Sequence, residues 1–180
     1  GNLWLVAYTG FYKVKPPAAE RTNLPQFTNY ELPPAADREQ PTHVRAVFEE
    51  SDSILWFGAF NGGLHRLDRR SGQLITWRRD AARPGALRHD NIYSLYFEPR
   101  RRELWIGHEA GIDRLALDGF SPEAPQEVRF RPLTGAGRLD SRVNVLAPAG
   151  QGRLWVGTGD QGLLLLDPAT GVVLRQCLPA

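Results

Sequence analysis

The stretch Glu103-Leu104-Trp105-Ile106-Gly107 occurs in four versions along this chain of 180 residues. Its counterparts are Asn2-Leu3-Trp4-Leu5-Val6, Ile54-Leu55-Trp56-Phe57-Gly58 and Arg153-Leu154-Trp155-Val156-Gly157. The tryptophans recur about every 50 residues. Self-similarity at such a period is typical of propellers, solenoids and other repeat arrays. The chain is therefore expected to consist of four successive copies of one structural unit.

Short apolar runs surround the tryptophan in each copy. One run begins seven or eight residues after each Trp, another comes later, and in every copy but the first a further run precedes the Leu-Trp pair. The runs are rich in β-branched, aliphatic and aromatic residues, and Gly, Pro, Asn or Asp bound them. These features predict short β-strands, since no segment shows a sustained helical period of apolar residues. Four strands in meander order form one propeller blade.

The sequence thus predicts an all-β fold, a β-propeller fragment of about four blades with a four-stranded antiparallel meander in each. Residues 1–180 are assigned to a single propeller segment. The expected blades are 1–32 (incomplete), 43–79, 91–133 and 142–178. A blade buries its faces only against other blades. We therefore expect a second copy of the chain, as a homodimer, or further blades of a longer protein to complete the ring.

Composition narrows the classes of function. The formal net charge is +2, so neither nucleic acid nor an acidic partner is expected. No apolar run approaches the ~18 residues that a membrane span needs, so no membrane contact is expected within this segment. The single cysteine, Cys177, cannot form an internal disulfide. Because the chain starts at Gly1 and has no methionine, we expect it to be an internal piece of a longer protein.

The longer connections are expected on one side of the propeller. In a meander blade, the link from an outermost strand to the next innermost strand shares a rim with the turn between the second and third strands. The links at 31–43, 80–91 and 133–142 therefore open onto a single face. Loops on one face of a rigid scaffold are common binding sites.

Candidate ligand-binding residues stand where these links enter the innermost strands. Their side chains can hydrogen-bond hydroxyl or carboxylate groups, and they are His43, Arg45, Arg88, His89, Asn91, Arg142 and Asn144. Phe60 and His108 are expected to add flat contacts. The four histidines lack the paired spacing of a metal site, so no metal is expected. Ordinary surface or turn positions remain the alternative for these residues.

No catalytic constellation is recognisable. The chain has no Gly-x-Ser-x-Gly elbow and no His-Glu-x-x-His motif. The segment Gly157-Thr158-Gly159-Asp160-Gln161-Gly162 matches the dinucleotide-binding pattern by letter, but that motif needs a following helix and a strand is predicted here. The repeated tryptophans are expected to pack between blades. We therefore expect a non-enzymatic domain without a cofactor.

Several segments resemble the two-component regulator propeller repeat. The resemblance rests on Leu104-Trp105-Ile106-Gly107, Leu154-Trp155-Val156-Gly157-Thr158, Gly62-Gly63-Leu64-His65-Arg66-Leu67-Asp68 and Leu87-Arg88-His89-Asp90-Asn91-Ile92. It covers essentially the whole chain, although the first copy lacks the Gly-Gly and Asp elements.

The resemblance implies an extracytoplasmic (periplasmic) sensor region of an inner-membrane histidine kinase or diguanylate cyclase. It further implies a small, carbohydrate-like ligand whose binding signals to an output domain. Two alternatives stay open. One is a protein-interaction or dimerisation scaffold without a small ligand. The other is a quinone-dependent or lyase-type propeller enzyme, because residues 67–77 are also similar to a quinone-cofactor propeller repeat.

Overall fold

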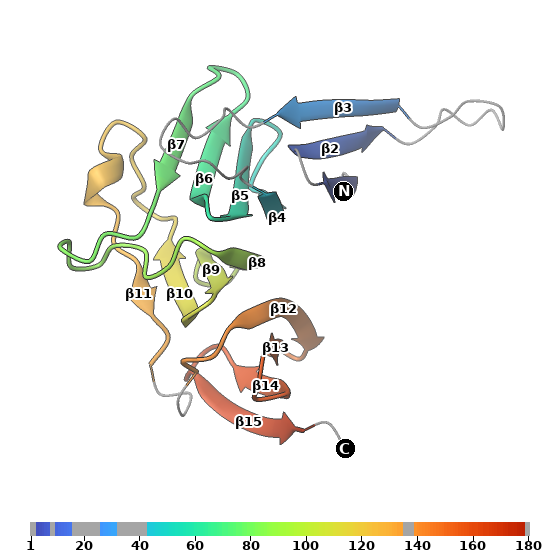
Figure 1. Cartoon of the computed structure of the whole chain (residues 1–180), viewed down its shortest axis with the longest axis vertical. Coiled ribbons are helices and arrows are strands. Elements are labelled where there is room, and N and C mark those ends of the chain that lie inside the picture. Colours follow the sequence, from blue (N-terminus) through green and yellow to red (C-terminus); the bar gives the residue numbers. More distant parts are fainter. Residues whose placement is uncertain (1–2, 8–9, 16–25, 32–42, 135–138, 179–180) are drawn as a thin grey trace, which may run out of the picture.

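The computed structural model describes residues 3–7, 10–15, 26–31, 43–134 and 139–178. Within these ranges the chain is almost entirely β-sheet, with one short 3-10 helix, η1 (Pro125–Glu127). The strands form four antiparallel sheets that follow one another along an arc (Figure 1). Over the same ranges, no helix has the length and apolar composition needed to cross a membrane.

The four sheets take their strands in chain order. The first has three strands, β1 (Leu3–Ala7), β2 (Gly10–Lys15) and β3 (Gln26–Glu31). The second contains β4 (His43–Glu49), β5 (Ile54–Phe60), β6 (Gly63–Asp68) and β7 (Leu74–Trp77). The third contains β8 (Ile92–Glu98), β9 (Glu103–His108), β10 (Gly111–Ala116) and β11 (Arg131–Pro132). The fourth contains β12 (Val143–Gly150), β13 (Arg153–Thr158), β14 (Leu163–Asp167) and β15 (Val172–Cys177).

Each sheet is a meander, because strands that are consecutive in the chain are neighbours in the sheet. The first strands of successive four-stranded sheets, β4, β8 and β12, contact one another on the concave side of the arc. The last strands, β7, β11 and β15, lie on the outside (Figure 1). This is the arrangement of successive propeller blades. The prediction of an all-β propeller fragment of about four blades is confirmed.

The hydrophobic cores lie between the sheets. Trp56 on β5 is fully buried in a cluster that includes Ile92 of the third sheet. Trp105 on β9 is fully buried in a second cluster, which includes Val143 of the fourth sheet. The prediction that the repeated tryptophans pack between blades is confirmed for these two. The side chain of Trp4 lies outside the described residues.

The glycine two residues after each of these tryptophans lets the next innermost strand approach. A Cβ atom on Gly58 would lie 2.8 Å from Ile92 Cβ, and one on Gly107 would lie 2.8 Å from Val143 Cγ1. Real Cβ atoms do not approach so closely, because the interior is close-packed. The Trp-x-Gly spacing therefore encodes a contact between blades, with a buried β-branched residue of the next blade seated on the glycine.

The third sheet departs from the expected pattern at its outermost strand. The apolar run at 128–133 predicts a full strand, but β11 has only two residues. The chain just before β11 pairs with the link between β7 and β8. The Phe130 N–H donates to Gly85 O at 2.8 Å, and Arg129 Nη1 donates to Pro84 O at 2.6 Å. These bonds satisfy backbone groups that a fourth strand would otherwise pair.

Candidate functional site

The link from β7 to β8 (78–91) runs across one end of the second and third sheets (Figure 1). The Gly63 N–H, at the start of β6, donates to Asp90 O in this link at 2.9 Å. On the fourth sheet, the Gly159 N–H of the β13–β14 turn donates to Arg142 O at 2.8 Å. The links and the turns between second and third strands therefore share a rim, as the meander predicts.

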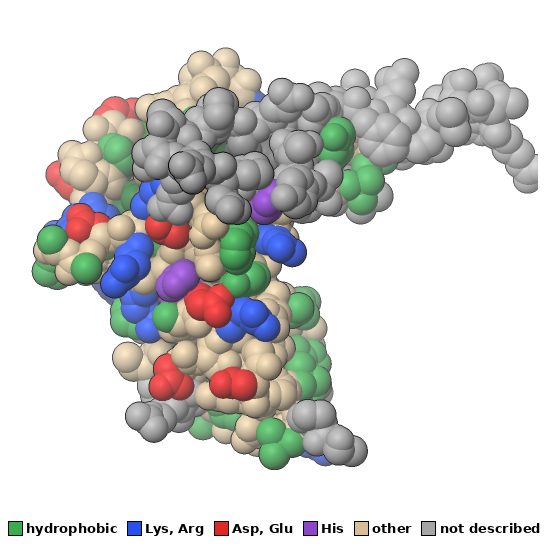
Figure 2. Space-filling view, viewed as in Figure 1, with side chains coloured by type: hydrophobic (Ala, Val, Ile, Leu, Met, Phe, Trp, Pro, Cys, Tyr) green, Lys and Arg blue, Asp and Glu red, His purple; other side chains and the backbone are tan. Residues whose placement is uncertain are grey.

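This rim is called the link face here, and its described parts are 61–62, 78–91, 109–110, 139–142 and 159–162. Basic, acidic and histidine side chains gather over the middle of the face (Figure 2). A face of this kind combines charge with hydrogen-bonding groups on a rigid scaffold, which suits binding.

An ion pair between half-buried Arg88 and buried Asp113 fixes the 78–91 link to the third sheet. Asp113 on β10 has no exposed surface and accepts hydrogen bonds from Arg88 Nε at 2.6 Å and from the Arg88 N–H at 3.1 Å. Arg88 Nη2 also donates to Ile112 O at 2.9 Å. Arg88 thus makes three hydrogen bonds to β10, two through its guanidinium and one through its backbone N–H, and positions the link.

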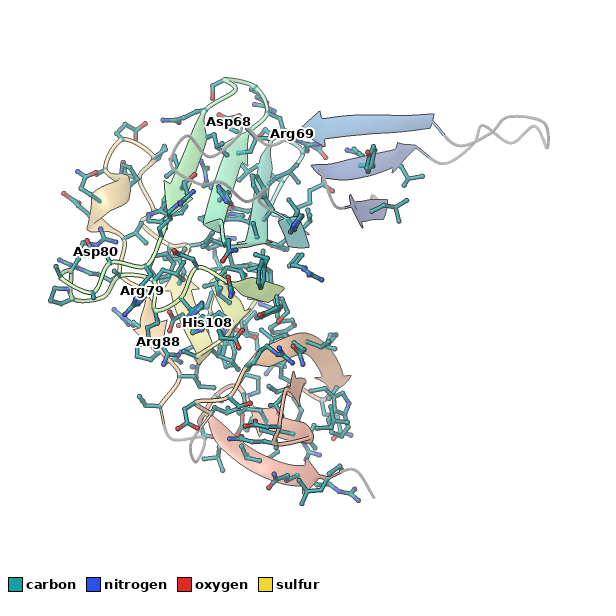
Figure 3. All side chains as sticks on the ribbon, in the orientation of Figure 1. Asp68, Arg69, Arg79, Asp80, Arg88 and His108 are labelled. Atoms are coloured by element: carbon teal, nitrogen blue, oxygen red, sulfur yellow. The ribbon has the colours of Figure 1, made fainter. Side chains whose placement is uncertain are left out.

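His108 completes this cluster, and Figure 3 shows it next to Arg88. The ring is fully buried, and its Nε2 lies 3.1 Å from Asp113 Oδ2. Its Nδ1 accepts the Ala110 N–H at 3.1 Å, which leaves Nε2 as the protonated nitrogen facing the carboxylate. Burial raises the pKa of Asp113, but the hydrogen bonds and charges of His108 and Arg88 outweigh burial and hold the pKa below its usual value.

These contacts correct the sequence-based expectation for His108. Its side chain has no exposed surface, so its ring cannot be a flat contact for a ligand. The binding role of Arg88 stays a prediction, because its side chain is 35% exposed while its guanidinium donates to Asp113 and Ile112 and holds the link in place. The physical reason for the contacts of both residues is the same: a buried carboxylate must be paired, and these side chains pair it.

Two further predicted residues shape the link. Asn91 Oδ1 accepts the Asn61 N–H at 2.9 Å and so holds the β5–β6 turn. His89 Nδ1 accepts the Asn91 N–H at 3.0 Å. Burial, followed by the influence of His108, lowers the pKa of His89. The neutral ring is therefore favoured, and it braces the point where the link enters β8.

Three innermost strands carry a β-bulge at the same position. The register shifts between Val44 and Ala46 on β4, between Ile92 and Ser94 on β8, and between Val143 and Val145 on β12. The extra residues are Arg45, Tyr93 and Asn144. A bulge takes one residue out of the ladder and re-aims its side chain, and bulges are over-represented beside functional sites.

Two neighbouring aromatic rings lie beside these bulges, and an arginine lies over each of them. Arg45 Cζ lies 5.9 Å from the centre of the Phe60 ring, and the centres of the Phe60 and Tyr93 rings are 6.3 Å apart. Arg142 Cζ lies 5.7 Å from the centre of the Tyr93 ring. Both arginines are exposed and both rings are half-buried. We call Arg45, Phe60, Tyr93, Arg142 and Asn144 the bulge row.

Tyr93 is also tied to the β9–β10 turn. Its hydroxyl donates to Glu109 Oε2 at 2.5 Å. Burial, followed by the hydrogen bond and charge of Glu109, raises the pKa of Tyr93. The phenol therefore keeps its proton, and the bond fixes the orientation of the ring.

The structure thus brings Arg45, Phe60 and Arg142 of the predicted residues into one row, with Asn144 at the third bulge. His43 pairs with Phe60 across the β4–β5 ladder, at the same end. Sequence reasoning missed two members of the site. Neither Tyr93 nor Glu109 is among the residues that the sequence predicts for the site. The available signal for Tyr93 was its alignment with Arg45 and Asn144.

Two surface pockets lie away from the bulge row. One, of about 240 Å³, is lined by residues around Phe120 in the third sheet. The other, of about 310 Å³, lies between β7 and η1. At the latter, Trp77 Nε1 donates to Pro125 O at 2.9 Å and Arg83 Nη1 donates to Gln126 O at 2.6 Å, so the fold already uses these donors. Neither pocket is lined by a predicted site residue.

No three His, Cys, Asp or Glu side chains within the described ranges are grouped so as to hold a metal ion.

Comparison with known proteins gives one family and several relatives. Residues 137–160 match the family described as two component regulator propeller. A protein named Histidine kinase P4, from Formosa agariphila, is 23% identical over 109 residues, which cover 56% of this chain and 8% of that protein. The 137–160 match contains the link into β12 and the Trp155 motif.

Two solved structures from B. thetaiotaomicron share the fold. Both are described as extracellular domains of hybrid two-component systems. The first has a TM-score of 0.68 and 16% identity, and the match covers 99% of this chain and 23% of that chain. The second has a TM-score of 0.59 and 21% identity, and the match covers 98% of this chain and 26% of that chain.

The chain spans less than a tenth of the curated relative and about a quarter of each solved domain. At these identities the structural matches support the propeller fold, while the repeat itself is identified by the family match at 137–160. The same Leu-Trp motif recurs in the preceding sheets. The chain therefore contains one segment, residues 137–160, that matches the two component regulator propeller family, within a propeller fold that it shares with these extracellular domains.

Proposed function

We propose that this segment is part of a non-catalytic, ligand-sensing propeller of a bacterial signalling protein. Its location would be extracytoplasmic, in the periplasmic part of an inner-membrane protein. The family match, the similarity to a histidine kinase and the similarity to extracellular domains of two-component systems support this proposal. Binding of a small solute on the link face would then bias an output domain elsewhere in the protein.

The repeated bulge is the observation that carries the binding proposal. Three consecutive blades interrupt their first ladder at the same position, so that Arg45, Tyr93 and Asn144 leave the regular pairing. An arc that served only as a scaffold would gain from unbroken ladders. Repetition of the interruption next to two aromatic rings and two exposed arginines favours a recognition surface.

The expected ligand is a small, carbohydrate-like solute. Half-buried Phe60 and Tyr93 present flat apolar surface, while Asn144 and the two arginines provide hydrogen-bonding groups. Small-molecule sites combine apolar contacts of this kind with a few polar groups that fix orientation.

A binding screen on the 180-residue chain tests the proposal. Neutral sugars and small organic acids would be titrated by isothermal calorimetry. For any ligand found, Phe60→Ala and Arg142→Ala should each weaken binding about tenfold, or about 1.4 kcal/mol. Arg70→Ala is the matched control, since Arg70 is exposed in the β6–β7 turn. Equal affinity in the wild type and both site variants would remove the bulge row as the binding site.

A second candidate function is assembly with a further blade, which is supported by exposed apolar side chains on one face of the fourth sheet. Val145, Leu163 and Val172 are 53%, 40% and 45% exposed. In the ladder they lie on the same face of the fourth sheet as Trp155. The equivalent faces of the second and third sheets are covered by the next sheet.

We propose that this apolar face packs against another blade, and that a homodimer is one way to supply it. Analytical ultracentrifugation decides whether a second copy is the partner. A homodimer predicts a mass near twice 20.2 kDa that falls to the monomer value in Leu163→Glu. A wild-type monomer at all concentrations would contradict the homodimer.

A further inference from the structure

We infer that the bulge row takes an anionic ligand, a flat ring compound that carries a carboxylate or sulfate group. This inference rests on the proposed function, because it names the ligand class of the same site.

The charges of the row are the first argument. Arg45 and Arg142 are exposed, and each guanidinium lies over an aromatic ring, at 5.9 Å from Phe60 and 5.7 Å from Tyr93. Within the described part of the chain, neither guanidinium has a carboxylate at ion-pair distance. Among the described residues, the row therefore presents two positive charges that form no ion pair.

Carboxylates of the same face are engaged by donors of the protein. Asp113 is buried against Arg88, as described above. Asp90 Oδ1 accepts the Arg79 N–H at 2.6 Å, and Asp160 Oδ1 accepts the Ser141 hydroxyl. Glu109 accepts the Tyr93 hydroxyl. These acidic groups are held in place by local bonds, whereas Arg45 contacts the Phe60 ring and Arg142 contacts Tyr93, through its ring and through a side-chain hydrogen bond.

The second argument is the position of each guanidinium, whose Cζ lies 5.9 Å (Arg45) or 5.7 Å (Arg142) from a ring centre. When the guanidinium lies over a ring, the N–H groups in its plane remain available at its edge. Their fork matches the paired oxygens of a carboxylate or sulfate. Phe60 and Tyr93, whose ring centres are 6.3 Å apart and whose planes are tilted by 59°, provide the adjoining apolar surface. A ligand ring lying on Phe60 would bring its acidic substituent to Arg45, and one lying on Tyr93 would bring it to Arg142.

A neutral polyhydroxylated ligand fits the row less well. Such ligands need acceptors as well as donors, but the guanidiniums donate only and Glu109 is already bonded to Tyr93. Asn144 is the one amide of the row. The surplus of charged donors therefore selects an anion.

Matched neutral and acidic ligands test the inference on the full chain. Glucose and glucuronate form one pair, benzamide and benzoate a second, and sodium sulfate alone is the ring-free probe. The acidic member of at least one pair should bind at least tenfold more tightly than its neutral partner. Its affinity should fall as NaCl is raised from about 50 to about 500 mM, because salt screens exposed charges. Sulfate alone should bind more weakly than the acidic ring.

Variants separate this inference from the proposed function. Arg45→Gln and Arg142→Gln together should abolish the preference for the acidic member, and Arg70→Gln should leave it unchanged. Phe60→Leu should weaken both members of a pair. Asp68 and Arg69, beside the control residue, lie at the opposite end of the second sheet from His108 (Figure 3).

Three results would overturn the inference. Equal affinity for acidic and neutral members, with both weakened by Phe60→Leu, would refute the anion preference and leave the proposed site standing. An acid preference that persists in the double arginine variant would place the anion elsewhere. If no acidic ligand binds at concentrations up to about 10 mM, the bulge row does not bind these anions even with a millimolar dissociation constant, and the inference is wrong. Binding that is indifferent to Phe60→Leu would instead refute the proposed site.

Discussion

The third and fourth sheets carry the same motif but bury it differently. Trp105 and Ile112 are 0% and 1% exposed on the face that meets the fourth sheet. Trp155 is half-buried and Leu163, the counterpart of Ile112, is 40% exposed. On their opposite faces the two sheets are equally buried, since Leu104 and its counterpart in the fourth sheet are both 0% exposed. The difference therefore belongs to one face only.

The comparison shows that the motif encodes half of an interface. Its Trp, its Gly and the third-strand residue that pairs with this Gly form a surface that another blade must cover. The second and third sheets show it covered, while the described fourth sheet shows it open. Each prediction below compares a covered position with its open counterpart, or with a different residue at an equivalent place.

The largest contrast is expected for the tryptophans. Trp105→Ala should lower the free energy of unfolding by about 4 kcal/mol, because a large buried side chain leaves a cavity. Trp155→Ala should cost about half as much or less, since part of that ring already contacts solvent. Urea denaturation followed by circular dichroism measures both. Equal losses would show that the blade itself, and not its neighbour, provides the burial.

The glycines come next. Gly107→Ala should cost about 2–3 kcal/mol, because the new Cβ would lie 2.8 Å from Val143 Cγ1. Gly157→Ala should change stability by less than about 0.5 kcal/mol, because the nearest heavy atom, Val145 Cβ, would lie at 3.5 Å. The same denaturation assay applies. A costly Gly157→Ala would mean that this position is already packed in solution.

The free energy of unfolding is expected to depend on pH through His65, a position occupied by a different residue in the other sheets. His65 on β6 is buried, stacks on Phe57 at 4.7 Å between ring centres, and has Nδ1 2.9 Å from Thr76 Oγ1. Burial, followed by the charge of Arg78, lowers its pKa from 6.5 to about 4. Between pH 6.5 and about pH 4, His65 is therefore protonated in the unfolded chain and neutral in the folded chain.

Stability from His65 is thus fully present above pH 6.5 and is lost as pH falls toward about 4. Between pH 7.5 and 5 the loss should be about 2 kcal/mol. His65→Leu places the residue type that the fourth sheet has at the equivalent Leu164, and should flatten this dependence. Urea midpoints at the two pH values give the answer. An unchanged slope in the variant would assign the titration to another group.

The smallest effect concerns the residue paired with each tryptophan. Arg66 Cζ lies 5.8 Å from the centre of Trp56, and Arg114 Cζ lies 5.8 Å from the centre of Trp105. Leu165 pairs with Trp155 in the fourth sheet. Leu165→Arg should therefore raise stability by about 0.5 kcal/mol through a cation–π contact. A loss of similar size would show that the leucine is the better cover for this face.

Much of the fold could be predicted because the residue types of the repeat each favour one kind of local structure. The Trp-x-Gly spacing and the alternating runs define strands, and the meander order follows from their short connections. The outermost strand of the third sheet could not be predicted in the same way. Phe130 belongs to an apolar run, but its N–H pairs with Gly85 O across the link. A hydrogen-bond partner so distant in the sequence cannot be predicted from the local pattern of apolar residues.

The site was only partly predictable for a related reason. The meander places the links on one face, and this position predicts Arg45, Phe60 and Arg142 as site residues. Burial could not be read from the same positions, so His108 was assigned to ligand contact although the carboxylate of Asp113 requires it. A bulge depends on the register of two strands, and Tyr93 becomes visible as a site residue only once that register is known.

The central claim is that the bulge row on the link face recognises the ligand. The most direct test is a crystal structure of the chain with the best ligand of the paired screen. The account predicts density over Phe60 and Tyr93, with the acidic group at Arg45 or Arg142. Density in the pocket between β7 and η1, with the bulge row empty, would contradict it.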